Sequence, residues 1–371
     1  MLFRNVLIGL VLLLGGPAAS SLADPVLYNV FDLGMPEGFD SSHALDINNQ
    51  GQVVGYVKQG SSPKRGFLYE NGVLSFVTVE GRQTSEVAAI NNNGVMTGQV
   101  RDAFVASKTL GFVKGNGIET TFAPLGTGTS VTPKDINDAG VVVGDSTTVS
   151  SVGWRAFRWE NGTMTNLGAL NDSDDVPANV NSYAYGINAS GQITGSFDAS
   201  AIPFRSPAFL YENGAMTDIG ILPGYYAANV YAINDAGVIV GEAVGSGNTS
   251  VAFKYENGTM TSLGDLNGWR TAAYDINNHG VIVGIAGVGM PQSSVAFIYM
   301  DGQMIDLNTL IPADSGWHLL HANAINDLGQ IVGWGLFNGQ ERAFLLSPIP
   351  EPASLLLMSA GLLMCLRRKR D

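Results

Sequence analysis

Few residues in this chain could do chemistry. The histidines are His43, His279, His318 and His321, and Cys365 is the single cysteine. One cysteine excludes an internal disulfide framework and a Cys-rich zinc site. No Gly-x-Ser-x-Gly segment is present to form a nucleophile elbow. The sequence therefore contains no recognisable catalytic set, and we expect a protein that is not an enzyme.

Two groups of residues are weak metal candidates. Asp172, Asp174 and Asp175 could provide oxygen ligands for calcium, but they lack the spacing of an EF-hand loop and are better interpreted as a solvated acidic loop. His318 and His321 are three residues apart, which suits a metal on a helix, whereas their surroundings predict loop or strand. We expect no cofactor. A pair of carboxylates brought together from distant loops remains an alternative, and such a pair could act in a glycosidase or lyase.

The elements that must position any site are repeated along the chain. The pattern Ile-Asn-x-x-Gly-x-x-x-Gly occurs seven times, at spacings of 43 to 51 residues, and this period suits a four-stranded propeller blade. The Asn side chain can bond the backbone ahead of it, and the first Gly accepts a positive φ. These turn residues include Asn48 and Gly51, Asn137 and Gly140, Asn234 and Gly237, and Asn326 and Gly329.

One repeat shows where its strands lie. Residues 230–233 predict a short first strand, and residues 238–240 are apolar in succession, which predicts a second strand buried on both faces. In the third strand, Phe253 and Tyr255 share one face, which we expect to meet a neighbouring sheet. Asn257-Gly258 is a strong hairpin signal before the fourth strand. Units of this kind bury their apolar faces only by stacking on one another.

The two ends of the repeat region complement each other. The last unit stops at residues 343–346 without a fourth strand, and residues 28–34 have the fourth-strand pattern. We predict an all-β, seven-bladed β-propeller of four-stranded antiparallel blades over residues 24–348, with the last blade closed by residues 26–33. The second repeat departs most from the pattern, so its blade should be irregular. An open β-solenoid is disfavoured because no polar caps are visible.

The end of the propeller that carries the variable loops is the predicted ligand-binding face. In a four-stranded meander, the short Asn-x-x-Gly and Asn-Gly turns lie at one end, and the variable loops lie at the other. Aromatic platforms on these loops could bind glycans or peptides, or could merely pack the loops against the blades. The candidates are Trp154, Phe204, Tyr225, Tyr226, Trp269, Trp317 and His318.

The N-terminal segment is typical of a secretory signal peptide. Arg4 precedes an apolar run from Val6 to Leu14, and a small-x-small site ends at Ala23, so we expect export and cleavage by signal peptidase. Without residues 1–23 and 351–371, the chain keeps 14 basic and 30 acidic residues, a net charge of about −16. This acidic balance argues against nucleic acid as a partner, and the 45% share of apolar residues excludes a disordered chain.

The C-terminal segment has three parts: Pro350-Glu351-Pro352, an apolar run of 14 residues over 353–366, and the basic cluster Arg367, Arg368, Lys369 and Arg370. The run is shorter than the ~20 residues of an ordinary spanning helix, and the basic residues would hold that end on the cytoplasmic side. The segment resembles the PEP-CTERM sorting signal of Gram-negative bacteria. The resemblance implies a transient anchor in the inner membrane, processing by an exosortase-like enzyme, and release to the cell surface or extracellular matrix. A plain C-terminal transmembrane anchor is the alternative.

The repeats also resemble the HAF repeat of bacterial extracellular proteins, through segments such as Ala44-x-x-Ile47-Asn48-x-x-Gly51. The resemblance implies export and repetition but no established chemistry. We therefore expect an exported, non-enzymatic surface or matrix protein with a binding or structural role, and extracellular polysaccharide is a candidate partner. A polysaccharide-acting glycosidase or lyase using loop carboxylates, and a scaffold without a ligand, are the alternatives.

Overall fold

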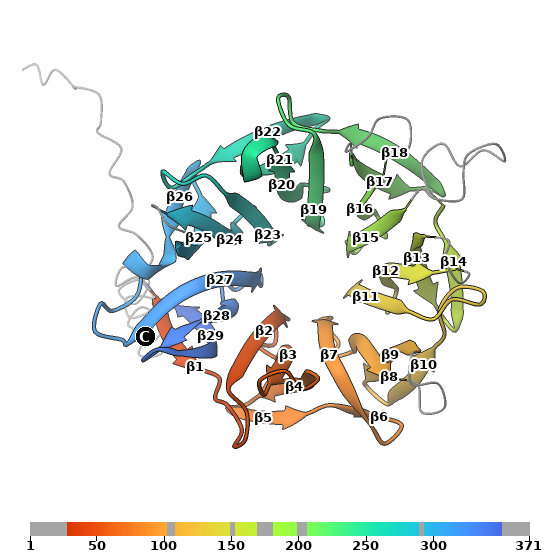
Figure 1. The fold of residues 1–371 in the computed structure, drawn as a ribbon, viewed down its shortest axis with the longest axis horizontal. Coiled ribbons are helices and arrows are strands. Elements are labelled where there is room, and N and C mark those ends of the chain that lie inside the picture. Colours follow the sequence, from red (N-terminus) through yellow and green to blue (C-terminus); the bar gives the residue numbers. More distant parts are fainter. Residues whose placement is uncertain are drawn as a thin grey trace, which may run out of the picture.

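The protein is a ring of β-sheets around a central axis (Figure 1). The computed structural model describes residues 28–101, 108–148, 153–168, 181–198, 206–288 and 293–350. Within these ranges, seven antiparallel sheets form the blades, which confirms the predicted propeller. No helix in the same ranges is long and apolar enough to cross a membrane. The signal peptide, the tail after Pro350, Phe204 and the aspartates at 172–175 lie outside the described residues.

The blades follow one another in chain order. Blades 1 to 3 comprise β2 (Ser41–Ile47), β3 (Val53–Lys58), β4 (Arg65–Glu70) and β5 (Val73–Phe76); β6 (Thr78–Val79), β7 (Arg82–Ile90), β8 (Met96–Arg101), β9 (Thr109–Gly115) and β10 (Ile118–Phe122); and β11 (Val131–Ile136), β12 (Val142–Thr147), β13 (Trp154–Glu160) and β14 (Thr163–Asn166). The extra strand β6 makes blade 2 the irregular one, as predicted.

Blades 4 to 6 repeat the four-stranded plan, and short 3₁₀ turns follow β20 and β26. They comprise β15 (Ser182–Ile187), β16 (Ile193–Phe197), β17 (Ala208–Glu212) and β18 (Ala215–Gly220); β19 (Ala227–Ile233), β20 (Ile239–Val244), η1 (Ser246–Asn248), β21 (Ser250–Glu256) and β22 (Thr259–Gly264); and β23 (Thr271–Ile276), β24 (Ile282–Val288), β25 (Ser293–Met300), β26 (Gln303–Asp306) and η2 (Leu307–Thr309).

Blade 7 joins the two ends of the ring. It contains β27 (Trp317–Ile325), β28 (Ile331–Phe337) and β29 (Gln340–Pro348), and its outermost strand is β1 (Tyr28–Asp32). The antiparallel register runs from Tyr28 opposite Pro348 to Asp32 opposite Phe344. The Arg342 guanidinium adds an ion pair to Asp32 at 3.1 Å. The predicted closure by the N-terminal strand is therefore confirmed.

The core lies between neighbouring blades. Every blade has one fully buried phenylalanine in its third strand, namely Phe67, Phe112, Phe157, Phe209, Phe253, Phe297 and Phe344. Phe297, for example, packs with Val240 and Ile276, which belong to two adjacent blades. Burying one such ring stabilises the fold by roughly 1.5–3 kcal/mol, so the repeated Phe is a main reason why blades stack.

The second glycine of the repeat allows the first two strands of a blade to approach closely. A Cβ on Gly55 would lie 2.1 Å from the backbone oxygen of His43, and one on Gly241 would lie 2.1 Å from that of Asn229. The pairing of β2 with β3 shifts register between Ala44 and Asp46. Such a bulge re-aims the side chains around it, and here the re-aimed residue, Asp46, contributes to the channel wall.

Candidate functional site in the central channel

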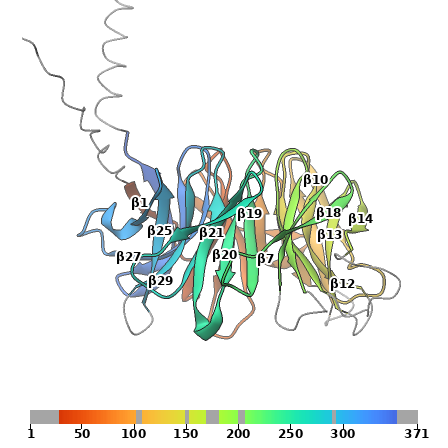
Figure 2. The ribbon, with the colours of Figure 1, turned by 90° about the horizontal axis from the view of Figure 1, so that it is seen from above.

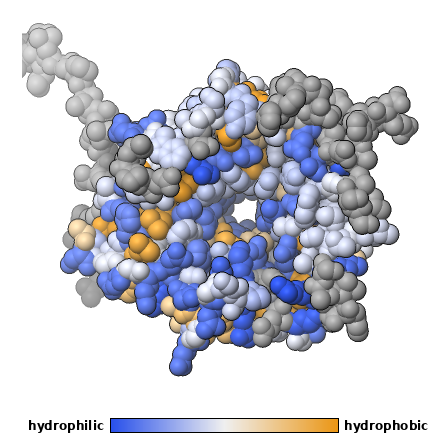
Figure 3. All heavy atoms as spheres, in the orientation of Figure 1, coloured by the Kyte–Doolittle hydropathy of each residue, from blue (hydrophilic) through white to orange (hydrophobic). Residues whose placement is uncertain are grey.

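The channel runs along the axis of the ring and is open in the space-filling view (Figure 3). At the Asn-x-x-Gly end, a closed ring of asparagine side chains surrounds it. Each Nδ2 donates to the backbone oxygen of the equivalent Asn in the next blade, at 2.9–3.1 Å. The members of this asparagine collar are Asn48, Asn91, Asn137, Asn188, Asn234, Asn277 and Asn326.

Each collar residue also builds its own turn. The Oδ1 of Asn48 accepts the backbone N–H groups of Gln50 and Gln52, both at 3.0 Å. One buried side chain therefore satisfies backbone groups in two blades, which is what buried polar groups require. The turn contact was predicted from the sequence, and the contact between blades was not.

A second ring of contacts lies one residue further along each turn. The N–H of Asn49 donates to Asn92 Oδ1 in the next blade at 2.8 Å, and the equivalent residues continue the pattern. Ala189 interrupts it, since alanine offers no acceptor to the N–H of Asp138. Six of the seven blade junctions therefore have this bond.

Three aspartates connect blades in pairs just inside the collar. Asp46 accepts the N–H groups of Ile47 in its own blade and Ile90 in the next, both at 2.7 Å. Asp135 and Asp275 repeat this arrangement at blades 3–4 and 6–7. The other blades have Ala or Gly at the equivalent position, namely Ala89, Gly186, Ala232 and Ala324. Blade 5 is therefore the one without such a carboxylate contact.

The position of these half-buried carboxyl groups on the channel wall changes their acidity. Burial raises the pKa of Asp46 and of Asp275 to about 7 and the pKa of Asp135 to about 6, and backbone N–H donors oppose the rise. The negative charge of Asp135 adds to the rise at the other two. Within the described part of the chain, no group of three or more His, Cys, Asp or Glu residues is arranged to hold a metal ion. The hydrogen bonds of these aspartates to the next blade make them connectors between blades.

Toward the variable-loop end, aromatic side chains form a continuous arc along the channel wall. Successive ring centroids lie 4.4–6.1 Å apart, in stacked, tilted and edge-on pairs. In order, the arc contains Tyr185, Tyr231, Tyr274, His321, Trp334, His43 and Tyr56. A lysine ends it on each side, with Lys134 Nζ 5.0 Å from the Tyr185 ring and Lys64 Nζ 3.9 Å from the Tyr56 ring. Three of these six pairs are stacked, one is tilted and two are edge-on.

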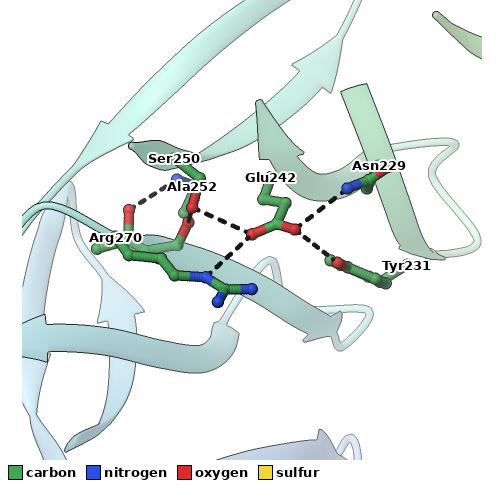
Figure 4. A network of polar contacts seen from close by, with 7 residues as sticks. Asn229, Tyr231, Glu242, Ser250, Ala252 and Arg270 are labelled. Atoms are coloured by element: carbon green, nitrogen blue, oxygen red, sulfur yellow. Dashed lines mark hydrogen bonds and ion pairs between the residues drawn. The ribbon is translucent and has the colours of Figure 1, made fainter. Parts of the chain in front are cut away.

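A buried carboxylate stands behind the arc in blade 5 (Figure 4). Glu242 accepts hydrogen bonds from Tyr231 Oη at 3.0 Å, and from Asn229 Nδ2 and Ser250 Oγ at 3.1 Å. Arg270 of the next blade places its Nε 3.8 Å away. Burial first, and then this carboxylate, raise the pKa of Tyr231 far above its usual range. Glu242 therefore has a complete set of partners and fixes the orientation of Tyr231.

The equivalent residue of blade 3 is less well satisfied. Asp145 is 5% exposed, and its Oδ1 accepts no hydrogen bond within the described residues. Lys134 Nζ lies 3.8 Å from that oxygen. Burial raises the pKa of Asp145 to about 6, and Lys134 and Thr132 oppose the rise. Asp145 is thus a buried carboxyl group that can gain or lose a proton near neutral pH.

The arc ends in a cavity of about 470 Å³ between blades 7 and 1. Its lining combines charged, hydroxyl and aromatic side chains: Asp40, Ser41, His43, Tyr56, Lys58, Lys64 and Glu341. The imidazole of His43 stacks on Tyr56 at 4.9 Å, and its Nε2 lies 3.4 Å from Glu341. We call this cavity the 7–1 pocket, and its volume lies in the range of small-molecule sites, about 300–1,000 Å³.

The aromatic residues predicted from the variable loops have separate environments. Trp317 stacks on Phe337 at 5.0 Å and meets Phe344 edge-on, so it belongs to the packing of blade 7. Tyr225 packs against the core of blade 5, whereas Tyr226 is 44% exposed. Trp154 and Trp269 are half-buried and His318 is exposed.

Sequence reasoning missed the arc, although a signal existed. Tyr185, Tyr231 and Tyr274 each stand two residues before the repeated isoleucine, in three successive repeats. Aligning the repeats on that isoleucine would have placed the three tyrosines side by side on the channel wall. Asp46, Asp135 and Asp275 share the position directly before it and could have been found in the same way.

Comparisons with known proteins describe the fold more than the site. A family model described as "Protein of unknown function (DUF3466)" matches residues 222–345, which span blades 5 to 7. No curated protein matches the chain. The solved structures similar to it include a gluconolactonase from Xanthomonas campestris, with 10% identity, a TM-score of 0.40, and coverage of 87% of this chain and 90% of that one.

Two further similar structures differ in function. The β-propeller domain of the Trilobed protease from Pyrococcus furiosus has 11% identity and a TM-score of 0.39, with coverage of 72% of this chain and 98% of that one. A puromycin hydrolase has 12% identity and a TM-score of 0.49, with coverage of 82% of this chain and 51% of that one. Likeness at this level carries no argument about activity.

Proposed function

We propose that the protein is an exported, non-enzymatic β-propeller that binds acidic polysaccharide of the cell surface or extracellular matrix in the 7–1 pocket. The pocket itself is the observation that carries the proposal. It joins hydrogen-bonding edges of the arc to two lysines, Lys58 and Lys64, in a body where acidic residues outnumber basic ones by 30 to 14.

The pocket combines a lysine that could pair with a carboxylate and two carboxylates that could accept from hydroxyl groups, which suits a ligand with both kinds of group. Lys64 is paired with Glu86 at 2.7 Å, whereas Lys58 forms no ion pair within the described residues. Lys58 is therefore the amine available to an anionic sugar such as a uronate. Asp40 and Glu341 can accept hydrogen bonds from sugar hydroxyls, which would orient the ring.

The proposed export and sorting of the protein rest on its two terminal segments. The signal peptide supports export, and the Pro-Glu-Pro, apolar and basic segments support sorting of the PEP-CTERM kind by an exosortase-like enzyme. The repeats support the HAF resemblance. Mass spectrometry of the surface protein tests this part of the proposal: the mature chain should begin at Asp24 and lack Arg367 to Arg370. Retention of those four residues on the surface protein would contradict the sorting proposal.

A glycan array tests the binding proposal. Purified residues 24–350 should bind uronate-containing glycans, and Lys58→Ala should weaken that binding at least tenfold. Lys254→Ala removes one positive charge from blade 5, distant from the pocket, and should bind like the parent. Equal binding by Lys58→Ala and the parent, or no glycan bound by the parent, would overturn the proposal.

A second candidate function is hydrolysis or elimination on the same polymer, and Asp145 favours it. A buried carboxyl group with a pKa of about 6 suits general acid–base work near neutral pH. Turnover should be assayed with the same glycans that bind. Glycan cleavage by the parent that disappears in Asp145→Asn, with the melting temperature unchanged, would replace the non-enzymatic proposal with this one.

A further inference from the structure

We infer that, while its tail holds it to a membrane, the propeller turns its asparagine collar toward the bilayer and its variable-loop end, with the 7–1 pocket, away from it. This inference rests on the proposed tail anchor and concerns how the folded body is presented. It commits to a lipid surface as the partner that faces the collar end.

The chain leaves the ring beside a collar turn of blade 7. Tyr28 and Pro348 are paired across β1 and β29, so both terminal segments leave the body at one point. A Cβ on Gly329 would lie 3.3 Å from Pro348 Cγ. Gly329 belongs to the turn of the collar residue Asn326, because its N–H bonds the backbone oxygen of Asn326 at 3.0 Å. The exit point is therefore at the collar end of blade 7.

The length of the connection keeps that end close to the membrane. Ala353, where the apolar run begins, is five positions after Pro348 in the chain. A fully extended chain covers at most ~3.3–3.6 Å per residue, so the exit point lies within about 18 Å of the start of the run. The seven residues of β28 span about 23 Å at 3.3 Å per residue, and the side view shows the strands crossing the thickness of the disc (Figure 2). The 7–1 pocket therefore lies one strand length further out.

The collar end is suited to lie near a bilayer without entering it. Its turns present the carboxylates of Asp138, Asp235 and Asp327, which bond across the blade junctions. Charged groups are costly to transfer into the hydrocarbon region, so this end should remain in water. The same tether leaves the variable loops and the pocket free to meet polymer outside.

Single-cysteine reporters test the orientation. The folded body has no cysteine, so the full mature chain with Cys365→Ser accepts one reporter at a time. Ala236→Cys lies in a collar turn and Ser61→Cys lies in a variable loop, and both positions are exposed. Each variant is labelled with a donor fluorophore and reconstituted in phosphatidylethanolamine–phosphatidylglycerol vesicles that contain an acceptor lipid.

Two readouts separate the inference from its premise. Flotation with the vesicles reports whether the tail anchors the chain, and energy transfer reports which end faces the lipid. We expect flotation of both variants, with energy transfer at least twofold higher from residue 236 than from residue 61, and neither in a chain that ends at Pro350. Equal or reversed transfer in floating protein overturns the orientation alone. Failure of the full chain to float overturns the tail anchor and the orientation with it.

Discussion

The side-chain amide of Asn326 donates to the backbone oxygen of Asn48 at 3.0 Å, across 278 residues of sequence. This bond closes the asparagine collar between blades 7 and 1, and β1 completes blade 7 by pairing with β29. Local turn chemistry and long-range ring closure therefore depend on one residue type. Each collar Asn is buried and forms hydrogen bonds in two blades. Loss of one should therefore destabilise the neighbouring blade as well as its own turn.

A collar substitution should destabilise the whole ring. In Asn234→Ala, the N–H groups of Ala236 and Val238 lose their acceptor. The backbone oxygen of Asn277 loses one of its two donors and keeps the Gly280 N–H. Leaving buried polar groups unsatisfied costs about 1–3 kcal/mol, and we expect a loss of at least that size in urea unfolding.

Asn234→Asp refines the same experiment, because aspartate keeps the acceptor within its own turn. It replaces the donor to the next blade with a carboxylate oxygen that faces the backbone oxygen of Asn277. Asn213→Asp, in an exposed hairpin turn, is the matched control and should change stability little. If Asn234→Asp unfolds at the same urea concentration as the parent, the contact between blades contributes nothing.

Filling the gap in the second ring should stabilise the protein. Ala189→Asn would provide an acceptor for the N–H of Asp138, as Asn92 does for Asn49 at 2.8 Å. One hydrogen bond contributes about 0.5–1.5 kcal/mol net, so the urea midpoint should rise. Ala236→Asn changes a neighbouring collar turn without facing an open donor and should give no gain. A midpoint for Ala189→Asn at or below that of this control would contradict the prediction.

The repeat made most of the fold predictable. Local signals such as Asn257-Gly258 and the buried Phe253 recur in nearly every unit, so one unit specified its strands, turns and buried face. The unmatched strand over residues 28–34 then specified the closure. Residues near the axis were harder, because the role of Asn48 toward the next blade depends on the curvature of the ring.

The candidate site was predictable only in part. Reasoning from loops directed attention to Trp317 and Tyr225, which the structure packs against blades. The arc instead uses positions on the inner strands, such as Tyr231. In a single sequence, these positions show only the usual alternation of side chains along a strand. Asp46 lies at a bulge in the pairing of β2 with β3, and a hydrophobic pattern does not reveal a bulge.

The connecting aspartates should make stability depend on pH. Burial raises the pKa of Asp46 and Asp275 to about 7, against about 3.9 in an unfolded chain. Between these values the folded state binds more protons than the unfolded state, so stability should fall as pH rises from about 4 to 7 and level off above. Each pKa unit corresponds to about 1.4 kcal/mol, so the change should reach a few kcal/mol.

Urea unfolding of the parent and Asp275→Asn at pH 5 and pH 8 measures this effect. Asparagine keeps one acceptor and cannot ionise, so the variant should lose less stability than the parent between the two pH values. Asp314→Asn, at an exposed position of a loop, corrects for the general change in net charge and should keep the parent's dependence. Parallel pH profiles for all three proteins would show that Asp275 does not titrate in this range.

Removal of the closing strand should open the ring. Deleting residues 24–33 exposes the edge of β29, removes the pairing of Tyr28 with Pro348, and breaks the Asp32–Arg342 ion pair. Because each blade is stabilised by its neighbours, we expect a melting temperature at least 10 °C lower. A synthetic peptide of residues 24–33 should restore much of that loss in trans, whereas a scrambled peptide should not. A deletion variant that melts with the intact protein would mean that the other blades hold the ring closed without β1.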